Sequence, residues 1–366
     1  METRKLEKLG IETSLLGFGC MRFPTTPEGG IDEAEAEKMM DKAIAAGVNY
    51  IDTAYPYHGG ASEPFVGKVL KKYDRNSFYL ATKLPVWKVE VIEDVDTVFC
   101  EQLSRLQTEY IDFYLMHALN KERFDRMVEI GCIERLEQLK AEGKIRFAGI
   151  ASHYYDTLLR GAKDPRVDVL QGSGNILERG MLDRIAKEPR FHDKGLLINK
   201  VYAAGLLPGF FPVETLIDAV LSYPASGVLI GIGTVEQANA AMADRRECTD
   251  GIPSFEQVLS VLEKYYAPIP CDRCQRCVCP HGTEIHTVFR QYQYYFMGKA
   301  HWALRKLNMG IEDGIRLCRA CETMDCVGMC PRKIRIPQEM ERVWELAAEA
   351  SRSAGTRFPA SPARSG

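Results

Sequence analysis

The sequence predicts an α/β protein in which a (β/α)8 barrel of the TIM type is followed by a small, mainly helical, cysteine-rich domain. Three observations support this fold class. Short apolar runs rich in β-branched residues alternate with longer amphipathic stretches, which is typical of a parallel sheet with crossover helices. Eight such runs recur at intervals of roughly 20 to 35 residues, the repeat of a barrel. Eight of the twelve cysteines gather near the C-terminus.

The elements are expected from periodicity and from their end signals. The helix over 32–46 begins at an Asp32 cap and ends at Gly47, and the helix over 62–72 begins at a Ser62 cap. Residues 4–13 predict a hairpin with Gly10 near its turn. The expected strands are 15–20, 48–51, 78–82, 111–116, 145–150, 167–171, 196–200 and 227–230.

Length and composition suggest one large domain and one small one. We expect the barrel over 1–250, a helical connector over 251–269, the cysteine-rich domain over 270–350 and a disordered tail over 351–366. The formal net charge of −3 gives no field that would attract nucleic acid or an anionic membrane. The chain has no run long enough to span a bilayer and no secretory signal at Met1. A cytoplasmic protein is therefore expected, with its oligomeric state open.

The cysteines form two runs that each end in proline. They read Cys271-x2-Cys274-x2-Cys277-x-Cys279-Pro280 and Cys318-x2-Cys321-x4-Cys326-x3-Cys330-Pro331. Thiolates at this spacing predict two ferredoxin-like [4Fe–4S] clusters. Because the fourth ligand crosses over in two-cluster ferredoxins, one cluster would take Cys271, Cys274, Cys277 and Cys330, and the other Cys318, Cys321, Cys326 and Cys279.

Two alternatives stay open for these cysteines. Zinc also accepts paired Cys-x2-Cys knuckles. Cys277 and Cys279 would also point to the same face of an extended chain, which suits one cluster better than two. A turn before Pro280 must then separate them, or one of the two is not a ligand.

Chemistry in a barrel lies at the carboxyl ends of the strands. Asp52 and Tyr57 follow the second strand, Lys83 ends the third and His117 follows the fourth. A tyrosine has an ordinary pKa near 10, and a nearby ammonium such as Lys83 would lower it. Asp52 would keep Lys83 charged, and His117 could orient a carbonyl oxygen. The set predicts a proton-transfer site.

These motifs resemble the aldo/keto reductase family over roughly residues 3 to 245. The resemblance rests on Lys5-Leu-x-Lys-Leu-Gly, Leu16-Gly-Phe-Gly19, Asp52-Thr-Ala-x-x-Tyr57, Ser62-Glu63, Ala81-Thr-Lys83 and Asp112-Phe-Tyr-Leu-Met-His117. The cysteine tail is similar to the ferredoxin-like extension of a subgroup of that family. The resemblance implies NAD(P)H-dependent reduction of an aldehyde or ketone to an alcohol, or the reverse, by direct hydride transfer. It implies that Tyr57 is the general acid/base, Lys83 and Asp52 its tuning pair, and His117 the group that orients the substrate.

The resemblance also implies a nicotinamide site near Asp52. Gly19, Cys20 and Met21 would lie beside the nicotinamide ribose, and Ser152, His153 and Gln171 would hold the carboxamide. Phosphate and adenosine binding is expected after the seventh and eighth strands, where glycines precede a helix N-terminus. The residues there are Ala203, Gly205, Leu207, Gly231, Gly233, Thr234, Glu236 and Gln237. Lys and Arg are absent from 231–243, which favours NADH over NADPH.

Two functions remain possible at this point. In the first, the protein is a carbonyl reductase whose clusters either hold the tail together or pass electrons. In the second, the barrel senses nicotinamide and the clusters relay electrons to a redox partner protein. Hydride transfer moves two electrons together whereas a cluster takes one, and the sequence supplies no flavin site to divide the pair.

Overall fold

The computed structural model describes residues 1–242, 251–298, 302–307, 317–318 and 321–353. The chain divides into two compact units. The first comprises 1–175, 184–205 and 211–252, and the second comprises 176–183, 206–210 and the chain from Pro253 onward. The domain limits expected from the sequence stay predictions.

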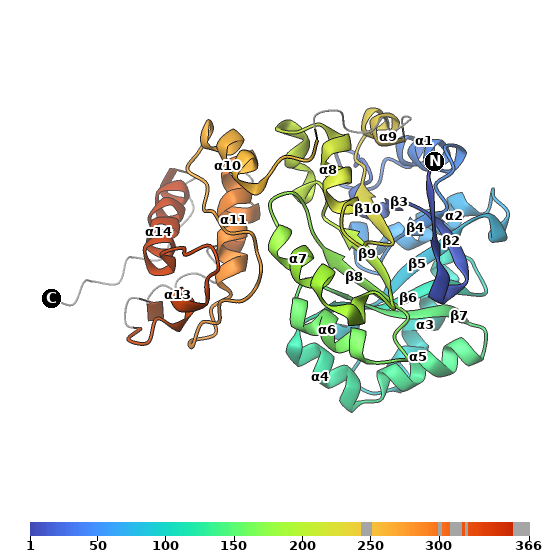
Figure 1. The fold of residues 1–366 in the computed structure, drawn as a ribbon. Coiled ribbons are helices and arrows are strands. Elements are labelled where there is room, and N and C mark those ends of the chain that lie inside the picture. The colour runs from blue at the N-terminus through green and yellow to red at the C-terminus, as the bar shows by residue number, and fades with distance from the viewer. Residues whose placement is uncertain (243–250, 299–301, 308–316, 319–320, 354–366) are drawn as a thin grey trace. The chain divides into compact units, whose positions relative to one another are not determined.

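Eight parallel strands of the first unit close into a barrel in the order β10-β3-β4-β5-β6-β7-β8-β9 (Figure 1). Closure comes from pairing of β10 with β3, in which Val228 lies opposite Leu16. The strands are almost wholly buried, as expected when helices cover a parallel sheet. The predicted eight-stranded barrel is therefore confirmed. The strands are β3 (Leu16–Gly19), β4 (Tyr50–Asp52), β5 (Tyr79–Leu84), β6 (Ile111–Leu119), β7 (Ile145–Ser152), β8 (Val169–Ser173), β9 (Gly195–Asn199) and β10 (Gly227–Gly231).

Helices connect successive strands. They are α1 (Glu33–Ala45), α2 (Ser62–Leu70), α3 (Glu93–Leu106), α4 (Lys121–Glu129), α5 (Cys132–Ala141), α6 (Tyr155–Lys163), α7 (Arg179–Lys187), α8 (Val213–Leu221) and α9 (Val235–Met242). Short 3-10 turns are η1 (Glu7–Leu9), η2 (Cys20–Arg22), η3 (Tyr57–Gly60), η4 (Arg75–Ser77), η5 (Val86–Lys88), η6 (Pro189–Phe191), η7 (Ala203–Gly205) and η8 (Leu207–Gly209).

The two predicted helix caps have different outcomes. Asp32 caps α1 as expected, because its side chain accepts a hydrogen bond from the Glu35 amide. The cap predicted at Ser62 is wrong, because Ser62 is the first helical residue and Ala61 is the cap. Burial explains the difference: the Ser62 hydroxyl is enclosed and hydrogen-bonds the Thr53 hydroxyl at 2.8 Å instead.

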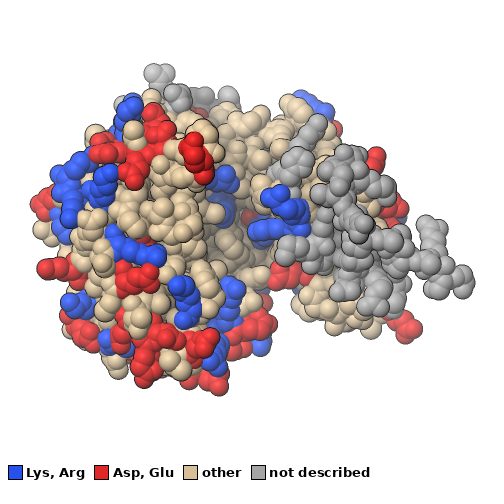
Figure 2. Space-filling view, turned by 180° about the vertical axis from the view of Figure 1, so that it is seen from behind, with Lys and Arg blue, Asp and Glu red and all other residues tan. Residues whose placement is uncertain are grey.

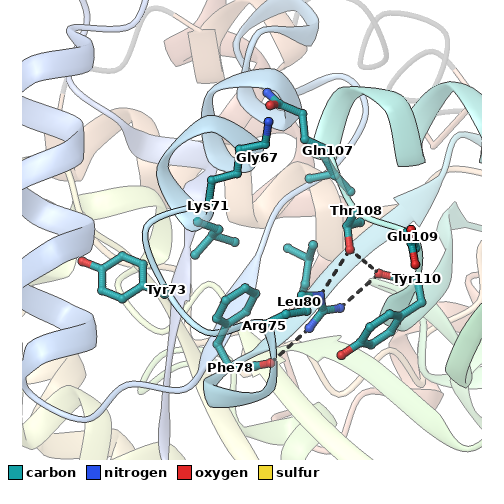
Figure 3. A pocket seen from close by; sticks show the side chains of 12 residues that line it. Gly67, Lys71, Tyr73, Arg75, Phe78, Leu80, Gln107, Thr108, Glu109 and Tyr110 are labelled. Carbon is teal, nitrogen blue, oxygen red and sulfur yellow. Dashed lines mark hydrogen bonds between the residues drawn. The ribbon is translucent and has the colours of Figure 1, made fainter.

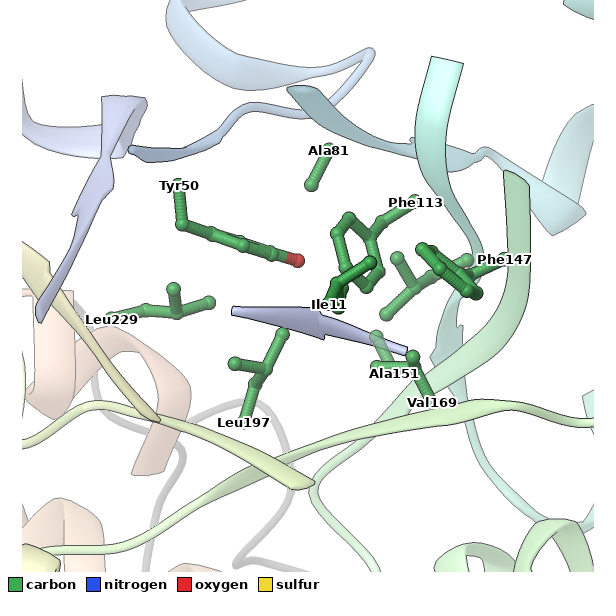
Figure 4. Packing of buried hydrophobic residues seen from close by; sticks show 10 residues of the cluster. Ile11, Tyr50, Ala81, Phe113, Phe147, Ala151, Val169, Leu197 and Leu229 are labelled. Carbon is green, nitrogen blue, oxygen red and sulfur yellow. The ribbon is translucent and has the colours of Figure 1, made fainter. Parts of the chain in front are cut away.

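The predicted N-terminal hairpin is confirmed and supplies part of the barrel core. Strands β1 (Thr3–Leu6) and β2 (Ile11–Ser14) pair antiparallel, with Gly10 at a φ of 64° between them. Ile11 packs among side chains from the barrel strands (Figure 4). The Phe113 ring centroid lies 4.9 Å from those of both Tyr50 and Phe147. This apolar layer keeps the interior packed below the strand ends that carry the polar site.

The second unit is mainly helical in its described residues. It contains α10 (Phe255–Glu263), α11 (Ile285–Gly298), α13 (Asp325–Met329) and α14 (Ile336–Ser353). α10 begins with a capping box between Ser254 and Gln257. α14 continues to Ser353, inside the segment predicted as a disordered tail, and 354–366 lie outside the described residues. No helix among the described residues combines the length and apolarity that crossing a membrane requires.

Candidate active site and cysteine groups

Two cavities that share lining residues lie at the carboxyl ends of the barrel strands. The larger has a volume of about 410 Å³ and the smaller about 70 Å³. Met21, Tyr57, Asn199 and Lys200 line both. The larger is also lined by Lys83, His117, Ser152, His153 and Gln171, and the smaller by Gly19, Asp52, Gly205 and Gly231. Folding thus brings together residues from nearly every predicted strand end.

A buried ion pair forms the floor of the site. The Lys83 Nζ atom donates to Asp52 Oδ1 at 2.7 Å and to the Thr53 carbonyl oxygen at 2.8 Å. Gln171 Nε2 donates to the other Asp52 oxygen at 3.1 Å. Burial disfavours the charged form of Lys83, but Asp52 and Tyr57 outweigh it and raise the pKa of Lys83. Lys83 is therefore a fixed ammonium.

Tyr57 lies directly above this pair. It begins η3, and the three residues that follow it have positive φ values of 53° at His58, 66° at Gly59 and 97° at Gly60. Two glycines adopt this reversal without steric cost, and it aims the tyrosine into the barrel mouth. The Lys83 Nζ atom lies 5.3 Å from the Tyr57 ring centroid.

Burial affects the pKa of Tyr57 more strongly than the nearby Lys83 ammonium does. Burial raises the pKa of Tyr57, while Lys83 acts in the lowering direction, and the pKa ends above its ordinary value. Lys83 therefore acts on the pKa of Tyr57 in the expected direction, but burial reverses the net shift. The reason is that the hydroxyl loses nearly all of its water, and one paired ammonium does not compensate. The side chain consequently holds its proton at neutral pH.

His117 faces the same cavity as a neutral ring. Burial lowers its pKa to about 3, and the positive charges of Lys83, Lys200 and Arg123 contribute. Its ring centroid lies 6.1 Å from that of Tyr57 and 5.4 Å from that of Trp87. Its Nδ1 atom is buried and has no hydrogen-bond partner among the described residues.

Other buried polar atoms of the larger cavity are also unsatisfied by the described residues. They are Gln171 Oε1, Asn199 Oδ1 and His58 Nε2. A buried polar atom without a partner costs about 1–3 kcal/mol, so their convergence on one cavity indicates a polar ligand. Sequence reasoning did not identify His58, Asn199 or Lys200. The last two end the predicted strand 196–200, so the strand-end rule could have found them.

The segments after β9 and β10 border the smaller cavity. Ala203, Ala204 and Gly205 have consecutive positive φ values of 45°, 62° and 87°. The Arg22 Nη2 atom donates to the Ala204 carbonyl at 2.6 Å and so ties this loop to the end of β3. At Gly19 a Cβ would lie 3.0 Å from the Ile230 carbonyl oxygen, so backbone packing there excludes a side chain.

The remaining predicted cofactor residues lie in three different surroundings. Gln237 in α9 is engaged within the chain, since its amide donates to Thr234 Oγ1 at 3.1 Å and its Oε1 accepts from the Gly233 amide at 2.9 Å. Glu236 lies in the same helix. Cys20 is buried in η2, and Leu207 belongs to the second unit. The Ser152 hydroxyl lines the cavity but donates to the Leu119 carbonyl at 2.7 Å.

A third cavity, of about 350 Å³, lies at the opposite end of the barrel. It is lined by the segments that precede β5 and β6 (Figure 3). Arg75 crosses it and donates to Thr108 Oγ1 and to the carbonyls of Phe78 and Tyr110 at 3.0–3.3 Å. Its polar groups bind one another, so the arrangement is that of a structural cross-brace.

The cysteines of the second unit fall into two groups. A small cavity is lined by Cys271, Cys274, Cys277 and Cys330, by the apolar Ile285, Phe289, Ile334 and Ile336, and by the polar Asp272, Gln275, His286 and Arg332. Burial raises the pKa of Cys318 to about 11, and the neighbouring Cys326, Cys279 and Cys321 add to that rise. Among the described residues, no three His, Cys, Asp or Glu side chains are arranged to hold a metal ion.

Fold and site together define a closed parallel barrel with a tyrosine, a lysine and a carboxylate gathered at its carboxyl end. Residues 15–211 match the model of the aldo/keto reductase family, which is more than half of the chain. The chain belongs to the aldo/keto reductase family.

Curated relatives and solved structures agree with this assignment. The chain is 30% identical to probable aldo-keto reductase 1 of Glycine max, over 59% of this chain and 62% of that protein. It is also 30% identical to aldo-keto reductase YhdN of Bacillus subtilis, over 57% of this chain and 64% of that one. The matches thus span less than two thirds of either relative. The holo form of aldo-keto reductase AKR11C1 from Bacillus halodurans superposes with a TM-score of 0.58 at 25% identity, covering 72% of this chain and 96% of that one.

Proposed function

We propose that the protein is an NAD(P)H-dependent oxidoreductase that reduces the carbonyl of a small aldehyde or ketone to an alcohol, or runs the reverse reaction. One observation carries the proposal. Tyr57 keeps its proton through burial, lies beside the buried Lys83 ammonium, and faces a cavity that also presents a neutral His117. Family membership supports the same reaction class.

The chain's own residues supply everything except the hydride, which bound NAD(P)H provides. The carbonyl carbon accepts the hydride with its electron pair while the C=O π bond opens toward oxygen. That oxygen takes the proton of the Tyr57 hydroxyl, and solvent later restores it. Lys83, held charged by Asp52, stabilises the phenolate left behind. The unpaired His117 nitrogen, in the tautomer protonated there, donates a hydrogen bond to the carbonyl oxygen.

The residues of the two cavities fit a nicotinamide nucleotide. The unsatisfied Gln171 Oε1 atom suits a carboxamide N–H, and Gly19, which lines the smaller cavity, presents no side chain to a ring and ribose. The loop 203–205 and the residues around Gly231 would hold the phosphates. The preference for NADH over NADPH stays a prediction.

The test replaces the proposed acid. Tyr57→Phe is expected to lower kcat for aldehyde reduction about 10²- to 10⁴-fold, while nucleotide binding measured by fluorescence stays within about twofold, because only the proton donor is lost. Tyr55→Phe is a matched control two positions away, since the Tyr55 hydroxyl contacts Glu101 and Lys88 rather than the cavity. Unchanged turnover in Tyr57→Phe would contradict the proposal.

We also infer that the second unit holds two [4Fe–4S] clusters, as an electron-transfer or structural module. The grouping of Cys271, Cys274 and Cys277 with Cys330 around one small cavity supports this, as does the proximity of Cys279 to the other run. Both groupings have the crossover pattern of two-cluster ferredoxins. A four-iron cluster is larger than one ion, so its thiolates need not converge on a single point.

Anaerobic purification with iron and sulfide analysis tests this inference. About eight iron atoms per chain are expected, falling to about four in either Cys330→Ala or Cys279→Ala. Cys100→Ala, at an exposed cysteine of α3, should leave the iron content unchanged. A colourless protein that contains zinc would overturn the inference. Full iron content in both variants would overturn the crossover assignment alone.

A further inference from the structure

His58 lines the larger cavity directly after Tyr57, and the proposed reaction does not use it. Its Nε2 atom is buried and has no hydrogen-bond partner among the described residues. The proposed reaction assigns His117 Nδ1 to the carbonyl oxygen and Gln171 Oε1 to the nucleotide carboxamide. The His58 nitrogen is therefore a buried polar atom for which no ligand group has yet been named.

The position of His58 indicates that this ligand group belongs to the substrate. Asn199 Oδ1 is also unpaired among the described residues, but Asn199 lines both cavities and can serve the nucleotide as well. His58 is a lining residue of the larger cavity and is not among the described residues that line the smaller one. The smaller cavity contains the glycines proposed to lie beside the nucleotide, Gly19, Gly205 and Gly231.

Packing holds the His58 ring in place. Its centroid lies 5.6 Å from that of Phe23, which in turn packs edge-on against Phe65 at 5.1 Å. Phe23 and Phe65 are both buried. His58 itself has a φ of 53°, a left-handed conformation that histidine adopts more readily than most residues with a side chain. The nitrogen is thus presented to the cavity by a ring with fixed neighbours.

The unpaired nitrogen is a hydrogen-bond acceptor. Burial lowers the pKa of His58, while the backbone of Cys20 and of Met21 acts in the raising direction, and the net shift is downward. The ring is therefore neutral at pH 7. A backbone group raises the pKa of an imidazole by accepting its N–H. Because Nε2 has no partner among the described residues, that proton belongs on Nδ1, and Nε2 presents a lone pair.

Surface charge gives no reason to expect an ionic substrate. The visible face of the protein mixes Lys and Arg with Asp and Glu (Figure 2), and the formal net charge is only −3. The described part of that face therefore has no extended field of one sign that would attract an ion. Selection then depends on short contacts inside the cavity, where a neutral acceptor suits a neutral donor such as a hydroxyl.

We propose that the substrate carries a hydroxyl on a carbon close to its reacting carbonyl, and that this hydroxyl donates to His58 Nε2, which makes His58 a specificity-determining residue. The inference rests on the proposed carbonyl reduction. Tyr57 and His58 are consecutive and line one cavity, so the hydroxyl belongs near the carbonyl that Tyr57 protonates. A substrate without the hydroxyl would leave the acceptor buried and unpaired, which a site of this kind penalises strongly.

An isosteric pair of aldehydes tests the proposal. In 2-methylbutanal, methyl groups replace the two hydroxyls of glyceraldehyde. The quantity measured is kcat/KM for glyceraldehyde divided by kcat/KM for 2-methylbutanal. His58→Leu should lower this ratio about tenfold, because only the hydroxylated aldehyde loses a partner. His58→Gln keeps an acceptor at similar reach and should retain most of the wild-type ratio.

A second variant covers the case in which His58→Leu does not fold. Asparagine adopts the left-handed conformation readily, but its shorter side chain withdraws the acceptor, so His58→Asn should lower the ratio in the same way. His192→Leu is the matched control, since His192 is exposed and contacts the Ala186 carbonyl oxygen, and its ratio should stay within about twofold. A wild-type ratio in the folded His58→Leu or His58→Asn protein would overturn the proposal.

The ribose of the nucleotide is the other source of hydroxyls for His58. In that case His58→Leu would raise the Kd for the nucleotide and slow both aldehydes equally, leaving the ratio unchanged, which also overturns the proposal. Fluorescence titration of each variant with the nucleotide separates the two sources.

A binding measurement separates failure of this inference from failure of the proposed function. Titration of glycerol, the alcohol formed from glyceraldehyde, into the complex with oxidised nucleotide needs no turnover. His58→Leu is expected to weaken glycerol binding about tenfold. If the wild type reduced neither aldehyde, the proposed function would fail, whereas a glycerol Kd equal in both proteins would overturn the role of His58.

Discussion

The two ends of the barrel each contain a buried carboxylate bound to a cation, yet the polar atoms around the two pairs differ. At the amino end, Asp112 accepts from Arg75 at 2.7 Å, from Arg146 at 3.0 Å and from the Leu80 amide at 2.9 Å. At the carboxyl end, Asp52 pairs with Lys83, and the surrounding cavity holds polar atoms with no partner among the described residues.

The comparison distinguishes polar groups that bind one another and support the fold from polar groups that are available to a ligand. The cavities at the two ends have similar volumes, about 350 and 410 Å³, so size does not distinguish them. Hydrogen-bond satisfaction does, because His117 Nδ1 and Gln171 Oε1 are buried without partners among the described residues, whereas Asp112 is paired with Arg75. The five predictions below test this contrast, beginning with the largest effect.

Lys83→Met should abolish most turnover. Removal of the ammonium leaves the Tyr57 phenolate unsupported and Asp52 buried without its cation, so kcat should fall at least about 100-fold. Steady-state kinetics with saturating nucleotide measures this loss. A variant that folds, shown by circular dichroism, and retains more than about a tenth of wild-type kcat would contradict the assigned role.

Asp112→Asn should lower the stability of the protein while leaving turnover nearly unchanged. The free energy of unfolding should fall by about 2–4 kcal/mol, because two arginines lose their buried partner, while kcat of the folded protein stays within about twofold. Urea denaturation and kinetics at low temperature measure the two quantities. Loss of activity without loss of stability would show that the amino end is not merely structural.

The pH dependence of reduction should show no titration near pH 6.5. The pKa of His117 is about 3 and that of Tyr57 lies above its ordinary value, so both keep their working forms from about pH 5 to pH 9. Reduction should decline only at higher pH, as Tyr57 loses its proton. A kcat profile with an acidic limb near pH 6.5 that disappears in His117→Asn would contradict this.

The lowered pKa of His117 also predicts how the stability of the protein changes with pH. As pH falls below about 6.5, the unfolded state protonates His117 before the folded state does, so the His117 contribution to stability decreases. The free energy of unfolding, measured in urea, should therefore fall more between pH 7 and pH 5 for the wild type than for His117→Asn.

The smallest expected effect is at Gln171. Gln171→Met removes a hydrogen bond to Asp52 and the amide proposed to meet the carboxamide, so the nucleotide Kd should rise about fivefold with kcat less affected. Fluorescence titration measures the change. An unchanged Kd would show that Gln171 supports Asp52 only.

The sequence by itself determined the barrel, the hairpin and the positions of Asp52, Tyr57, Lys83 and His117. Strand periodicity, Gly10 and the Asp32 cap depend on residues within one element, and the strand-end rule then places the four side chains at the same end. Local patterns of this kind are present before any long-range contact forms.

Tertiary structure alone decided the properties that depend on burial and on distant partners. Ser62 looked like a helix cap, but its surroundings turned its hydroxyl toward Thr53. Lys83 looked able to lower the pKa of Tyr57, but burial outweighed it. Gln171 reaches Asp52 across 119 positions of sequence, and Lys200 lowers the pKa of His117 from another strand. Desolvation and Coulomb interactions depend on three-dimensional distance, which no local pattern of residues encodes.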